Sequence, residues 1–578
     1  MAGDNMFKLK GFKPDWTNEP PPNGTYRSIF KWGAPDMFKH PNHRLYAMIK
    51  KEFLMTDADF EKKQYQGNEP VKVETPLRLA GQQVEQFIQI VGRENVSLDD
   101  YSRTKYASGK TMEEAMQLRR GIAGEVADLV VHPRSKEDVC KIVIYCNEQK
   151  IPVYVYGGGS SVNLGFKPVK GGITLVMNTH MNRVLSFNET NQTITVEPGI
   201  MGPAYENMLN NAPDFFNAKR RYTGGHFPQS FEYSSVGGWI VTLGSGQQSS
   251  YYGDMYDIVL SQEYVTPAGS FKTYDYPATA TGPKVNDIMK GSEGAFGVLV
   301  NATLKIFRYM PENRRKFALM FSTWADAVSA AREISQAEFG MPSVFRISDP
   351  EETDVALKLY GIEGTVIDRL ISLKGFKPME RCLCIGHTEG EKGFTKNVKK
   401  KVKRICRQHG AMYITGYPVK SWEHGRYTDP YMREDLNDFG IMIDTLESGV
   451  TWDKLHNLHQ GVRTYIKSRP NTICMTHASH FYPQGTNLYF IFMARMNDLN
   501  EYKNFQEGVI DQIQKHGGSL SHHHGVGKMI APWMEDHLGT VQMDVLRALK
   551  SHFDPHNIMN PGGTLYLDTP EPEKRFVT

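Results

Sequence analysis

Residues 153–165, Val-Tyr-Val-Tyr-Gly-Gly-Gly-Ser-Ser-Val-Asn-Leu-Gly, constrain the fold more than any other stretch of the chain. The β-branched, apolar start predicts a strand, and the three glycines end it. Because glycine has no Cβ, backbone N–H groups can turn toward one point and approach a ligand closely, while Ser160 and Ser161 add hydroxyl donors. The stretch therefore predicts a strand leading into a loop that binds an anion such as a pyrophosphate. A simple turn is the competing interpretation, since the spacing matches neither the dinucleotide fingerprint nor the P-loop.

Two later stretches have the same character and favour one large ligand. Residues 228–238 read Pro-Gln-Ser-Phe-Glu-Tyr-Ser-Ser-Val-Gly-Gly, and residues 291–297 read Gly-Ser-Glu-Gly-Ala-Phe-Gly. With residues 252–257, Tyr-Gly-Asp-Met-Tyr-Asp, this series resembles the flavoproteins of the vanillyl-alcohol oxidase type. The resemblance implies an α+β fold with a PCMH-type FAD-binding domain. We expect noncovalent FAD, because the 155–161 loop has no histidine or cysteine to attach the ring.

Composition is ordinary for a globular protein and narrows the partners. The 578 residues are several times the usual domain length, so two or three domains are expected. The formal net charge of +3 gives no reason to propose a nucleic-acid partner. Six cysteines without a C-x-x-C pair indicate neither a disulfide scaffold nor a zinc ribbon, and fit a reducing compartment.

The sequence shows none of the common targeting or membrane-spanning signals. Residues 1–10 contain no apolar signal-peptide core, no run approaches the roughly 18–20 apolar residues of a membrane helix, and residues 576–578 are not a peroxisomal tripeptide. We therefore expect a cytoplasmic or peripheral membrane protein.

The order of predicted elements divides the chain into four parts. Strand 128–132, helix 135–149 and strand 153–156 form a βαβ-like unit, and paired strands and helices follow residue 310. The predicted parts are a mostly helical N-terminal extension (1–115), an FAD-binding domain (116–308), a cap domain of a sheet covered by helices that includes the histidine loop (309–545), and a C-terminal segment (546–578).

Residues 396–407 form the densest basic run, with Val398, Val402 and Ile405 at helical spacing. One face of this predicted helix is therefore apolar and the other carries lysines. A solvated helix packed on the core is the plainer interpretation, and contact with a membrane surface is the alternative.

Residues 517–528, Gly-Gly-Ser-Leu-Ser-His-His-His-Gly-Val-Gly-Lys, contain three consecutive histidines inside the chain. The residues alone are compatible with metal binding, with a structural role and with proton transfer. No further His, Asp or Glu at metal-ligand spacing accompanies them, so we expect no metal. Proton transfer is favoured because the pKa of histidine lies near physiological pH.

This histidine motif resembles the signature of the alkyldihydroxyacetonephosphate synthase family, and the similarity extends from about residue 101 to about residue 561. The resemblance implies catalytic roles for Tyr489, His522, His523 and His524. The family's FAD-binding segments fall on Val155, Tyr156, Gly157, Gly158, Gly159, Ser160, Ser161, Gln229, Ser230, Phe231, Glu232, Tyr233, Ser234, Ser235, Thr242, Leu243, Gly244, Ser245, Gly291, Ser292, Glu293, Gly294, Ala295, Phe296 and Gly297.

Tyr489 also has an interpretation of its own. In the predicted strand 487–493 it shares a face with Ile491 and Met493, so its hydroxyl would be buried and need a partner. The alternative is a tyrosine that only packs in the core and has no catalytic role. With histidines at 522–524, a Tyr–His proton relay is the functional one.

Two arginines match substrate-binding positions of the family. Arg433 matches its phosphate-binding arginine, and Arg346, flanked by apolar residues on a predicted strand, matches another. Guanidinium suits phosphate geometry, and a salt bridge to Asp349, Glu434 or a similar residue is the alternative for each. At one further position where the family has an arginine, this chain has His477.

If the resemblance holds, the reaction replaces the acyl chain of acyl-dihydroxyacetone phosphate by a long-chain fatty alcohol, forming the ether bond of ether lipids. In the mechanism that the family implies, a flavin N5 adduct forms and there is no net redox change. An FAD-dependent D-2-hydroxy-acid dehydrogenase, of the D-lactate type, is the alternative enzyme. A flavin scaffold that recruits membrane partners is a third interpretation. We further expect a homodimer and peripheral membrane contact.

Overall fold

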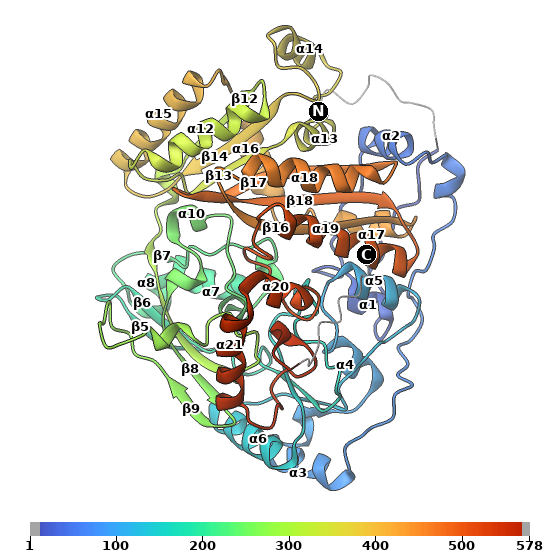
Figure 1. The fold of residues 1–578 in the computed structure, drawn as a ribbon, viewed down its shortest axis with the longest axis vertical. Helices are drawn as coiled ribbons and strands as arrows, with labels where there is room; N and C mark the ends of the chain where they lie inside the picture. The colour runs from blue at the N-terminus through green and yellow to red at the C-terminus, as the bar shows by residue number, and fades with distance from the viewer. Residues whose placement is uncertain (1–11, 569–578) are drawn as a thin grey trace.

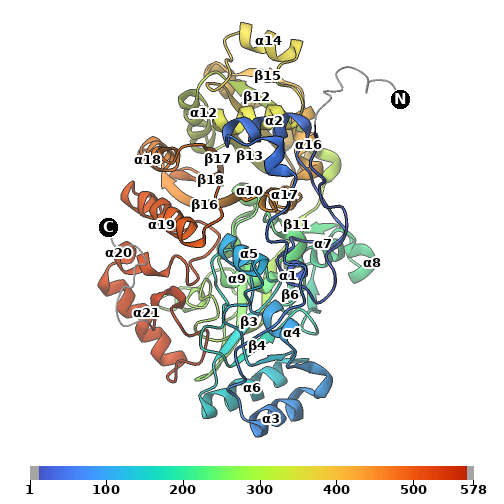
Figure 2. The ribbon, with the colours of Figure 1, turned by 90° about the vertical axis from the view of Figure 1, so that its right-hand side faces the viewer.

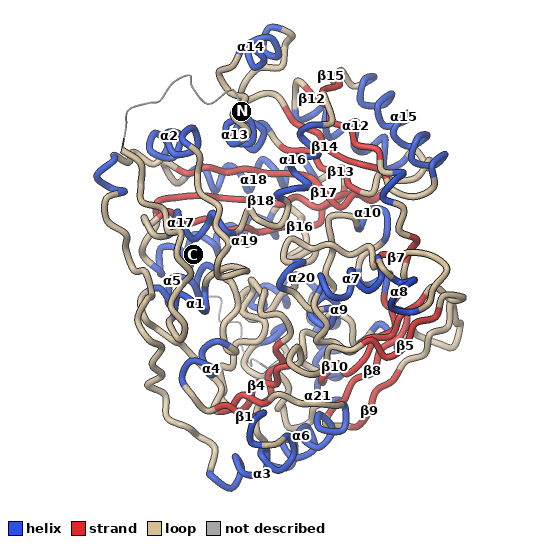
Figure 3. The backbone as a smooth tube through the Cα atoms, turned by 180° about the vertical axis from the view of Figure 1, so that it is seen from behind, coloured by secondary structure: helices blue, strands red, loops and turns tan. Residues whose placement is uncertain are grey.

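The computed structural model describes residues 12–568, and the 1–10 and 576–578 segments considered above lie outside this range. The chain forms a lower part with two sheets and an upper part built on a third, with helices against all of them (Figure 1). Figure 3 shows the three sheets as separate groups of strands.

The first sheet carries the glycine loop. Its order is β1-β2-β4-β3, with β2, β4 and β3 parallel and β1 antiparallel to β2. The predicted strand–helix–strand unit is confirmed, since α6 (Lys136–Gln149) connects β2 to β3. The strands are β1 (Val96–Ser97), β2 (Leu129–Val131), β3 (Val153–Tyr156) and β4 (Ile173–Val176).

The second sheet is antiparallel, in the order β5-β6-β10-β8-β9. Its strands are β5 (Val184–Asn188), β6 (Thr193–Val196), β8 (Val259–Thr266), β9 (Gly269–Lys272) and β10 (Val298–Lys305), and a separate pair joins β7 (Tyr222–Thr223) to β11 (Phe307–Arg308). The helices between these strands are α7 (Gly202–Asn210), α8 (Ala212–Phe216), α9 (Val236–Val241), α10 (Ser249–Tyr252) and α11 (Met255–Ile258).

The third sheet, in the cap, has seven antiparallel strands in the order β15-β12-β14-β13-β17-β18-β16. They are β12 (Arg315–Phe321), β13 (Val344–Ser348), β14 (Cys382–Thr388), β15 (Met412–Ile414), β16 (Ile441–Thr451), β17 (Thr472–Tyr482) and β18 (Gly485–Arg495). The helices are α12 (Trp324–Gln336), α13 (Pro350–Leu359), α14 (Val366–Leu373), α15 (Lys392–Gln408), α16 (Tyr417–Gly425), α17 (Tyr431–Asn437), α18 (Leu455–Ser468) and α19 (Leu499–Lys515).

Strand alternation distributes the cap core between the two faces of this sheet. On β12, Phe317 and Leu319 pack in the cluster that contains the apolar residues of α12 and α15, while Ala318 and Met320 pack with α16. On β18, the even-numbered Leu488, Phe490 and Phe492 join the first of these clusters. Tyr489, Ile491 and Met493 therefore face the opposite side, toward the lower part of the molecule.

The basic helix α15 packs on the core, which agrees with the interpretation of residues 396–407 as a solvated helix packed on the core. Val398, Val402 and Ile405 are buried between α12 and the sheet, which leaves the lysines to the outer face. None of the described helices combines the length and apolar character needed to span a bilayer.

The N-terminal extension alternates helices with extended chain and runs the length of the molecule, from α2 beside the cap to α3 at the opposite end (Figure 2). Its helices are α1 (Tyr26–Phe30), α2 (His43–Glu52), α3 (Gly81–Val91), α4 (Asp100–Lys105) and α5 (Met112–Arg119). Helix α3 begins at Gly81, three residues after Arg78, whose N–H donates to the Asp128 carboxylate over 2.9 Å.

The C-terminal segment returns to the FAD-binding domain. After α20 (Met534–Leu538) and α21 (Thr540–Phe553), Met559 forms a parallel bridge with Val153 at the start of β3. The Val153 N–H donates to the Ile558 carbonyl over 2.7 Å. This pairing covers the free edge of the strand that carries the glycine loop.

Candidate active site

The three predicted loops meet at one cavity of about 870 Å³ between the FAD-binding domain and the cap. Gly157 and Gly158 lie against the 233–235 turn, where an added Cβ would come within 2.3 Å of Ser235 Oγ and 2.4 Å of the Tyr233 carbonyl oxygen. Since no side chain fits there, these glycines let two loops close around the same space. The predicted anion-binding loop thus forms one wall of the cavity.

Sixteen of the predicted cofactor residues line this cavity: Val155, Gly157, Gly158, Gly159, Ser160, Ser161, Gln229, Ser230, Ser234, Ser235, Thr242, Gly244, Ser245, Glu293, Gly294 and Gly297. The other nine are not among the described lining residues: Tyr156, Phe231, Glu232, Tyr233, Leu243, Gly291, Ser292, Ala295 and Phe296. For Tyr156 the reason is strand alternation, which turns its ring away from the cavity onto Tyr106 and Phe166.

His226 also lines the cavity and is not among the site residues predicted from the sequence. It is 2% exposed, and neither ring nitrogen has a hydrogen-bond partner within the described chain. Burial lowers its pKa to about 3, so the ring is neutral. A buried imidazole without partners indicates a polar ligand in this part of the cavity. The glycine cradle and this histidine fit FAD, and the only signal in the sequence was the Gly-Gly pair preceding His226.

The histidine loop is held by two buried carboxylates from different domains. Glu447 on β16 accepts the backbone N–H groups of His522, His523 and His524 over 2.7, 3.0 and 3.0 Å, and the Ser521 hydroxyl over 2.7 Å. Burial alone would raise the pKa of Glu447, but the adjacent histidines and N–H groups outweigh it and hold the pKa well below its ordinary range.

On the other side of the loop, Glu293 of the FAD-binding domain accepts the N–H groups of Val526 and Gly527 over 2.6 and 2.7 Å. Burial raises the pKa of Glu293 to about 7. The loop therefore spans the domain boundary, with its ends fixed by the Gly-rich turn on one side and by the cap sheet on the other.

Ligand atoms of Glu447, His522 and His523 lie within 4.8 Å of one another, a grouping that could hold a metal ion. The carboxylate oxygens of Glu447, however, already accept four hydrogen bonds from the loop. This geometry fits a carboxylate that positions the loop backbone better than a metal ligand.

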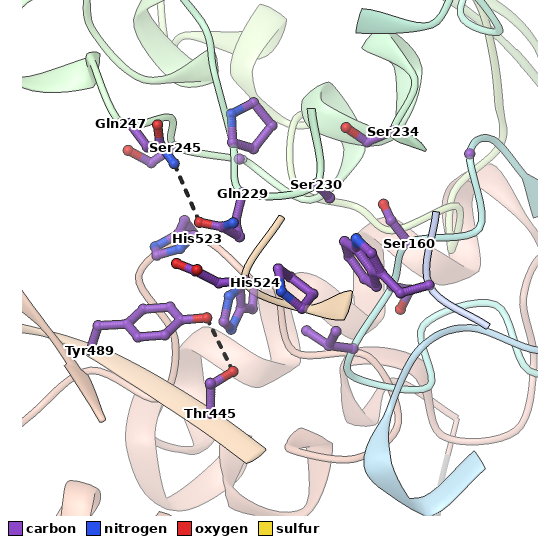
Figure 4. A pocket seen from close by; sticks show the side chains of 18 of the residues that line it. Ser160, Gln229, Ser230, Ser234, Ser245, Gln247, Thr445, Tyr489, His523 and His524 are labelled. Carbon is purple, nitrogen blue, oxygen red and sulfur yellow. Dashed lines mark hydrogen bonds between the residues drawn. The ribbon is translucent and has the colours of Figure 1, made fainter. Parts of the chain in front are cut away.

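Tyr489 lies near the middle of β18, the second strand from one edge of the cap sheet, opposite Glu447 on β16 and His477 on β17. Its hydroxyl donates to Thr445 Oγ1 over 3.1 Å, so its hydrogen-bond partner is a threonine rather than the histidine of the expected relay (Figure 4). The His523 and His524 rings lie 6.1 and 5.5 Å from the tyrosine ring, between centroids. Burial raises the pKa of Tyr489 to about 12, which keeps the hydroxyl protonated at neutral pH.

Figure 4 shows the two sides of the site facing each other. Ser160, Gln229 and Ser245 come from the FAD-binding domain, and Tyr489, His523 and His524 come from the cap and the histidine loop. Burial lowers the pKa of His523 and of His524, so both imidazoles are neutral and able to accept a proton. The arrangement supplies a protonated phenol and neutral bases beside the cofactor loops.

The two predicted arginines both line the cavity but differ in their pairing. Arg346 forms an ion pair with Glu352, which also binds His477 Nδ1 at 3.0 Å. Burial would raise the pKa of Glu352, but Arg346 and His477 outweigh it and lower the pKa to about 2. Arg346 is thus engaged in the salt bridge that was its alternative, although with Glu352 rather than Asp349 or Glu434.

Arg433 on α17 keeps unused donors. Its Nη1 donates to the Lys110 carbonyl over 3.0 Å, and its Nη2 lies 3.6 Å from Glu434. In the part of the chain that the structure describes, Nε and Nη2 have no hydrogen-bond partner, and the side chain is only 13% exposed. A buried guanidinium with free donors beside a cavity is suited to an anionic group of a ligand.

His480 lines the cavity because the backbone of β17 is irregular at this residue. The β17–β18 register shifts between Ser479 and Tyr482, and His480 has a φ of +56°. Its Nδ1 lies 2.8 Å from Ser245 Oγ. Regular alternation from His477 would have placed His480 on the opposite face, which explains why the sequence pattern did not reveal it.

Comparison with known proteins supports both domains. Residues 127–275 match the family model described as FAD binding domain, and residues 310–564 match the one described as FAD linked oxidases, C-terminal domain. The predicted fold class and FAD as cofactor are thereby confirmed.

An alkyldihydroxyacetonephosphate synthase from Dictyostelium discoideum is 32% identical over 483 residues, covering 80% of this chain and 77% of the relative. One from Trypanosoma brucei brucei is 27% identical over 559 residues, covering 92% and 89%. A solved alkyldihydroxyacetonephosphate synthase structure matches with a TM-score of 0.78 at 28% identity, covering 93% of this chain and 99% of that one. With the histidine motif, the cavity and these similarities together, the chain belongs to the alkyldihydroxyacetonephosphate synthase family of FAD-dependent enzymes.

Proposed function

We propose that this enzyme exchanges the acyl chain of acyl-dihydroxyacetone phosphate for a long-chain fatty alcohol, which forms an ether bond without net redox change. The observation that carries the proposal is the continuity of one cavity. It joins the glycine loops, Tyr489 with the histidines, the free donors of Arg433, and an arm lined by aliphatic side chains.

The aliphatic arm suits the hydrocarbon chains of both substrates. It is formed where α2, α13 and α17 meet the cavity face of the cap sheet, and its lining includes Leu45, Val355, Leu359, Met432, Ile443, Met475, Ile491 and Met493. Each CH₂ group buried here is worth roughly 0.8 kcal/mol, so a long chain gains far more than a short hydroxy acid would. This favours the synthase over the D-2-hydroxy-acid dehydrogenase.

The phosphate is assigned to Arg433, whose unused Nε and Nη2 can donate to phosphate oxygens. Arg346 is hydrogen-bonded to Glu352, whereas Arg433 lies 3.6 Å from Glu434, a glutamate that binds Arg119 more closely at 3.0 Å. Holding the phosphate there fixes the substrate at one end and leaves its carbon chain directed into the aliphatic arm.

FAD, held by the glycine loops, supplies the covalent chemistry of its ring when bound. The protein moves protons around it. A neutral imidazole of His523 or His524 accepts the proton of the attacking alcohol, and Tyr489, protonated at neutral pH, donates a hydrogen bond to a developing negative charge. The cap sheet and the histidine loop keep bulk water from the reacting atoms.

The deciding experiment incubates the purified flavoprotein anaerobically with acyl-dihydroxyacetone phosphate and radiolabelled hexadecanol, without an electron acceptor. Label in an alkali-stable ether product is the expected result. A parallel reaction with D-lactate and a dye acceptor tests the dehydrogenase. Turnover only in the second reaction would replace the synthase by the dehydrogenase.

We further propose that the enzyme contacts a phospholipid bilayer surface through α14, rather than through the basic helix α15. Val366, Ile367, Leu370 and Leu373 on α14 are 72%, 62%, 54% and 83% exposed. The basic residues Arg369, Lys374 and Lys377 adjoin them, and α14 projects from one end of the molecule (Figure 1). This helix follows α13, which lines the aliphatic arm, so substrates with long chains could pass between bilayer and cavity.

A double variant, Leu370→Glu with Leu373→Glu, should abolish co-sedimentation with phosphatidylcholine vesicles. The matched control is Val541→Glu with Val545→Glu on α21, whose side chains are 79% and 57% exposed. Equal loss of vesicle binding in both double variants, or no loss in the α14 variant, would contradict this contact. Light scattering of the same samples tests the predicted homodimer.

A further inference from the structure

Asp254 is half-buried at the start of α11 and forms the hub of two hydrogen-bond chains that reach the cavity. Its Oδ2 accepts the Tyr482 hydroxyl over 2.7 Å, and its Oδ1 accepts the Ser245 hydroxyl. Neither Asp254 nor Tyr482 belongs to the site described above.

The first chain leads through two members of the histidine triplet. Tyr482 Oη lies 2.8 Å from His522 Nε2, and His522 Nδ1 lies 3.1 Å from His523 Nδ1. His523 lines the cavity. The second chain is shorter and leads from Ser245 to His480, which also lines the cavity.

An ionised carboxylate can only accept hydrogen bonds, and this fixes the proton positions along the first chain. Tyr482 must donate to Asp254, so His522 Nε2 carries a proton and donates to Tyr482. His522 Nδ1 is then the acceptor for the Nδ1–H of His523, whose remaining nitrogen, Nε2, is left unprotonated. The Glu447 carboxylate, 3.6 Å from His523 Nδ1, favours the same tautomer.

We propose that Asp254 is a positioning residue for the exchange reaction, acting through Tyr482 and His522 to keep Nε2 of His523 free to accept a proton. The chain from His523 to Asp254 also provides the exit route for that proton. This inference rests on the proposed function.

The stoichiometry of the reaction creates the need for such a route. The alcohol O–H bond and the acyl-bearing C–O bond break, the ether C–O bond forms, and the fatty acid leaves as a carboxylate, so one proton remains and no electrons are exchanged. His523 Nε2 takes the proton, and its Nδ1 proton moves to His522 Nδ1. The Nε2 proton of His522 moves to Tyr482 Oη, and the Tyr482 proton moves to Asp254 and on to water.

The test compares Asp254→Asn with Asp254→Glu. Asparagine is as good an N-cap as aspartate, so the start of α11 is preserved, but its NH₂ group cannot accept and disturbs one of the two chains. We expect kcat to fall by about 10- to 100-fold, the scale of a weakened base. KM and the visible flavin spectrum should be unchanged, and Asp254→Glu should recover part of the rate.

Tyr482→Phe removes the hydroxyl that connects Asp254 to His522 and should lower kcat by a similar factor. This variant tests the inference even if a glutamate does not fit at position 254. The matched controls are Tyr256→Phe and Asp287→Asn, a second tyrosine–aspartate pair bonded over 2.8 Å, neither member of which is among the described cavity-lining residues. Both controls should keep the wild-type kcat.

Wild-type kcat in both Asp254→Asn and Tyr482→Phe would overturn the inference, and so would a loss confined to KM or to flavin content. A wild-type enzyme that makes no ether product would instead contradict the proposed function, which separates the two failures.

Discussion

At the residue scale, the chemistry depends on polar groups whose protonation is set by burial. Tyr489 stays a phenol and His523 and His524 stay neutral because desolvation disfavours their charged forms. The site thereby offers acid and base together at neutral pH, as proton transfer during the exchange requires.

Tyr489→Phe tests the acid directly. Only the hydroxyl is lost, and its partner Thr445 is half-buried rather than fully buried, so the free energy of unfolding should fall by no more than about 1–2 kcal/mol. FAD should remain bound. Alkyl transfer should slow by about 10²- to 10⁴-fold, measured with labelled hexadecanol. A Phe variant with the wild-type rate would remove Tyr489 from the mechanism.

Arg433→Leu tests the phosphate contact. Loss of a charge-assisted hydrogen bond should weaken binding of phosphorylated substrate by about 2–4 kcal/mol, or roughly 30- to 1,000-fold in apparent affinity. FAD affinity should change little. Arg183→Leu is the control, because that arginine is 63% exposed and pairs with Glu197 away from the cavity. If both variants bind substrate equally well, Arg433 has a structural role only.

At the element scale, the site is made by loops that tolerate no added atoms. The glycine loop after β3 and the 233–235 turn touch directly, and Glu447 and Glu293 hold the two ends of the histidine loop. Because these elements come from distant parts of the chain, a change in one loop should displace its partner.

Gly158→Ala should therefore reduce FAD content. Its Cβ would lie 2.4 Å from the Tyr233 carbonyl oxygen, a backbone atom, so one of the two loops must shift. Gly81→Ala is the matched control, since its Cβ meets nothing within 4 Å and alanine should be neutral or stabilising at that helix start. The ratio of visible flavin absorbance to protein concentration measures the effect. Full flavin content in Gly158→Ala would show that the loops can separate without loss of cofactor.

At the scale of the whole molecule, a buried ionic cluster attaches the N-terminal extension to the cap. Asp438, which is 1% exposed, accepts both Arg27 Nη groups over 2.9 Å and also binds Arg119. Arg119 Nη2 in turn binds Glu434 at 3.0 Å, next to the proposed phosphate contact Arg433. The extension thus helps to fix α17 and with it one wall of the cavity.

Asp438→Asn should destabilise the protein by about 3–5 kcal/mol at pH 7, because the buried guanidinium of Arg27 loses its carboxylate partner and that of Arg119 keeps only Glu434. Burial would raise the pKa of Asp438, but Arg119 and Arg27 outweigh it and lower the pKa below its ordinary value. A lowered pKa means that this stabilisation is complete above pH of about 4 and is lost as the pH falls further. Urea unfolding at pH 7 and at lower pH measures the difference.

The difference in the free energy of unfolding between wild type and Asp438→Asn should therefore become smaller at acidic pH. A gap that widens as the pH falls, or that is absent at pH 7, would show that the cluster does not attach the extension.

The sequence by itself predicted the cofactor loops, the βαβ unit around β3 and the position of the histidine motif. These features depend on local requirements, such as glycine where no Cβ fits, alternation along a strand, or three contiguous histidines. The same alternation correctly placed Tyr489, Ile491 and Met493 on one face.

Only the tertiary structure decided what those residues touch. Thr445 as the partner of Tyr489, Glu447 beneath the histidine loop and the Asp254–Tyr482 chain join residues far apart in the sequence, through strand register and domain contact. The entry of His480 depended on a one-residue irregularity in β17. Such contacts depend on how helices, strands and loops pack against one another. The periodicity of residues within one segment carries no information about that packing.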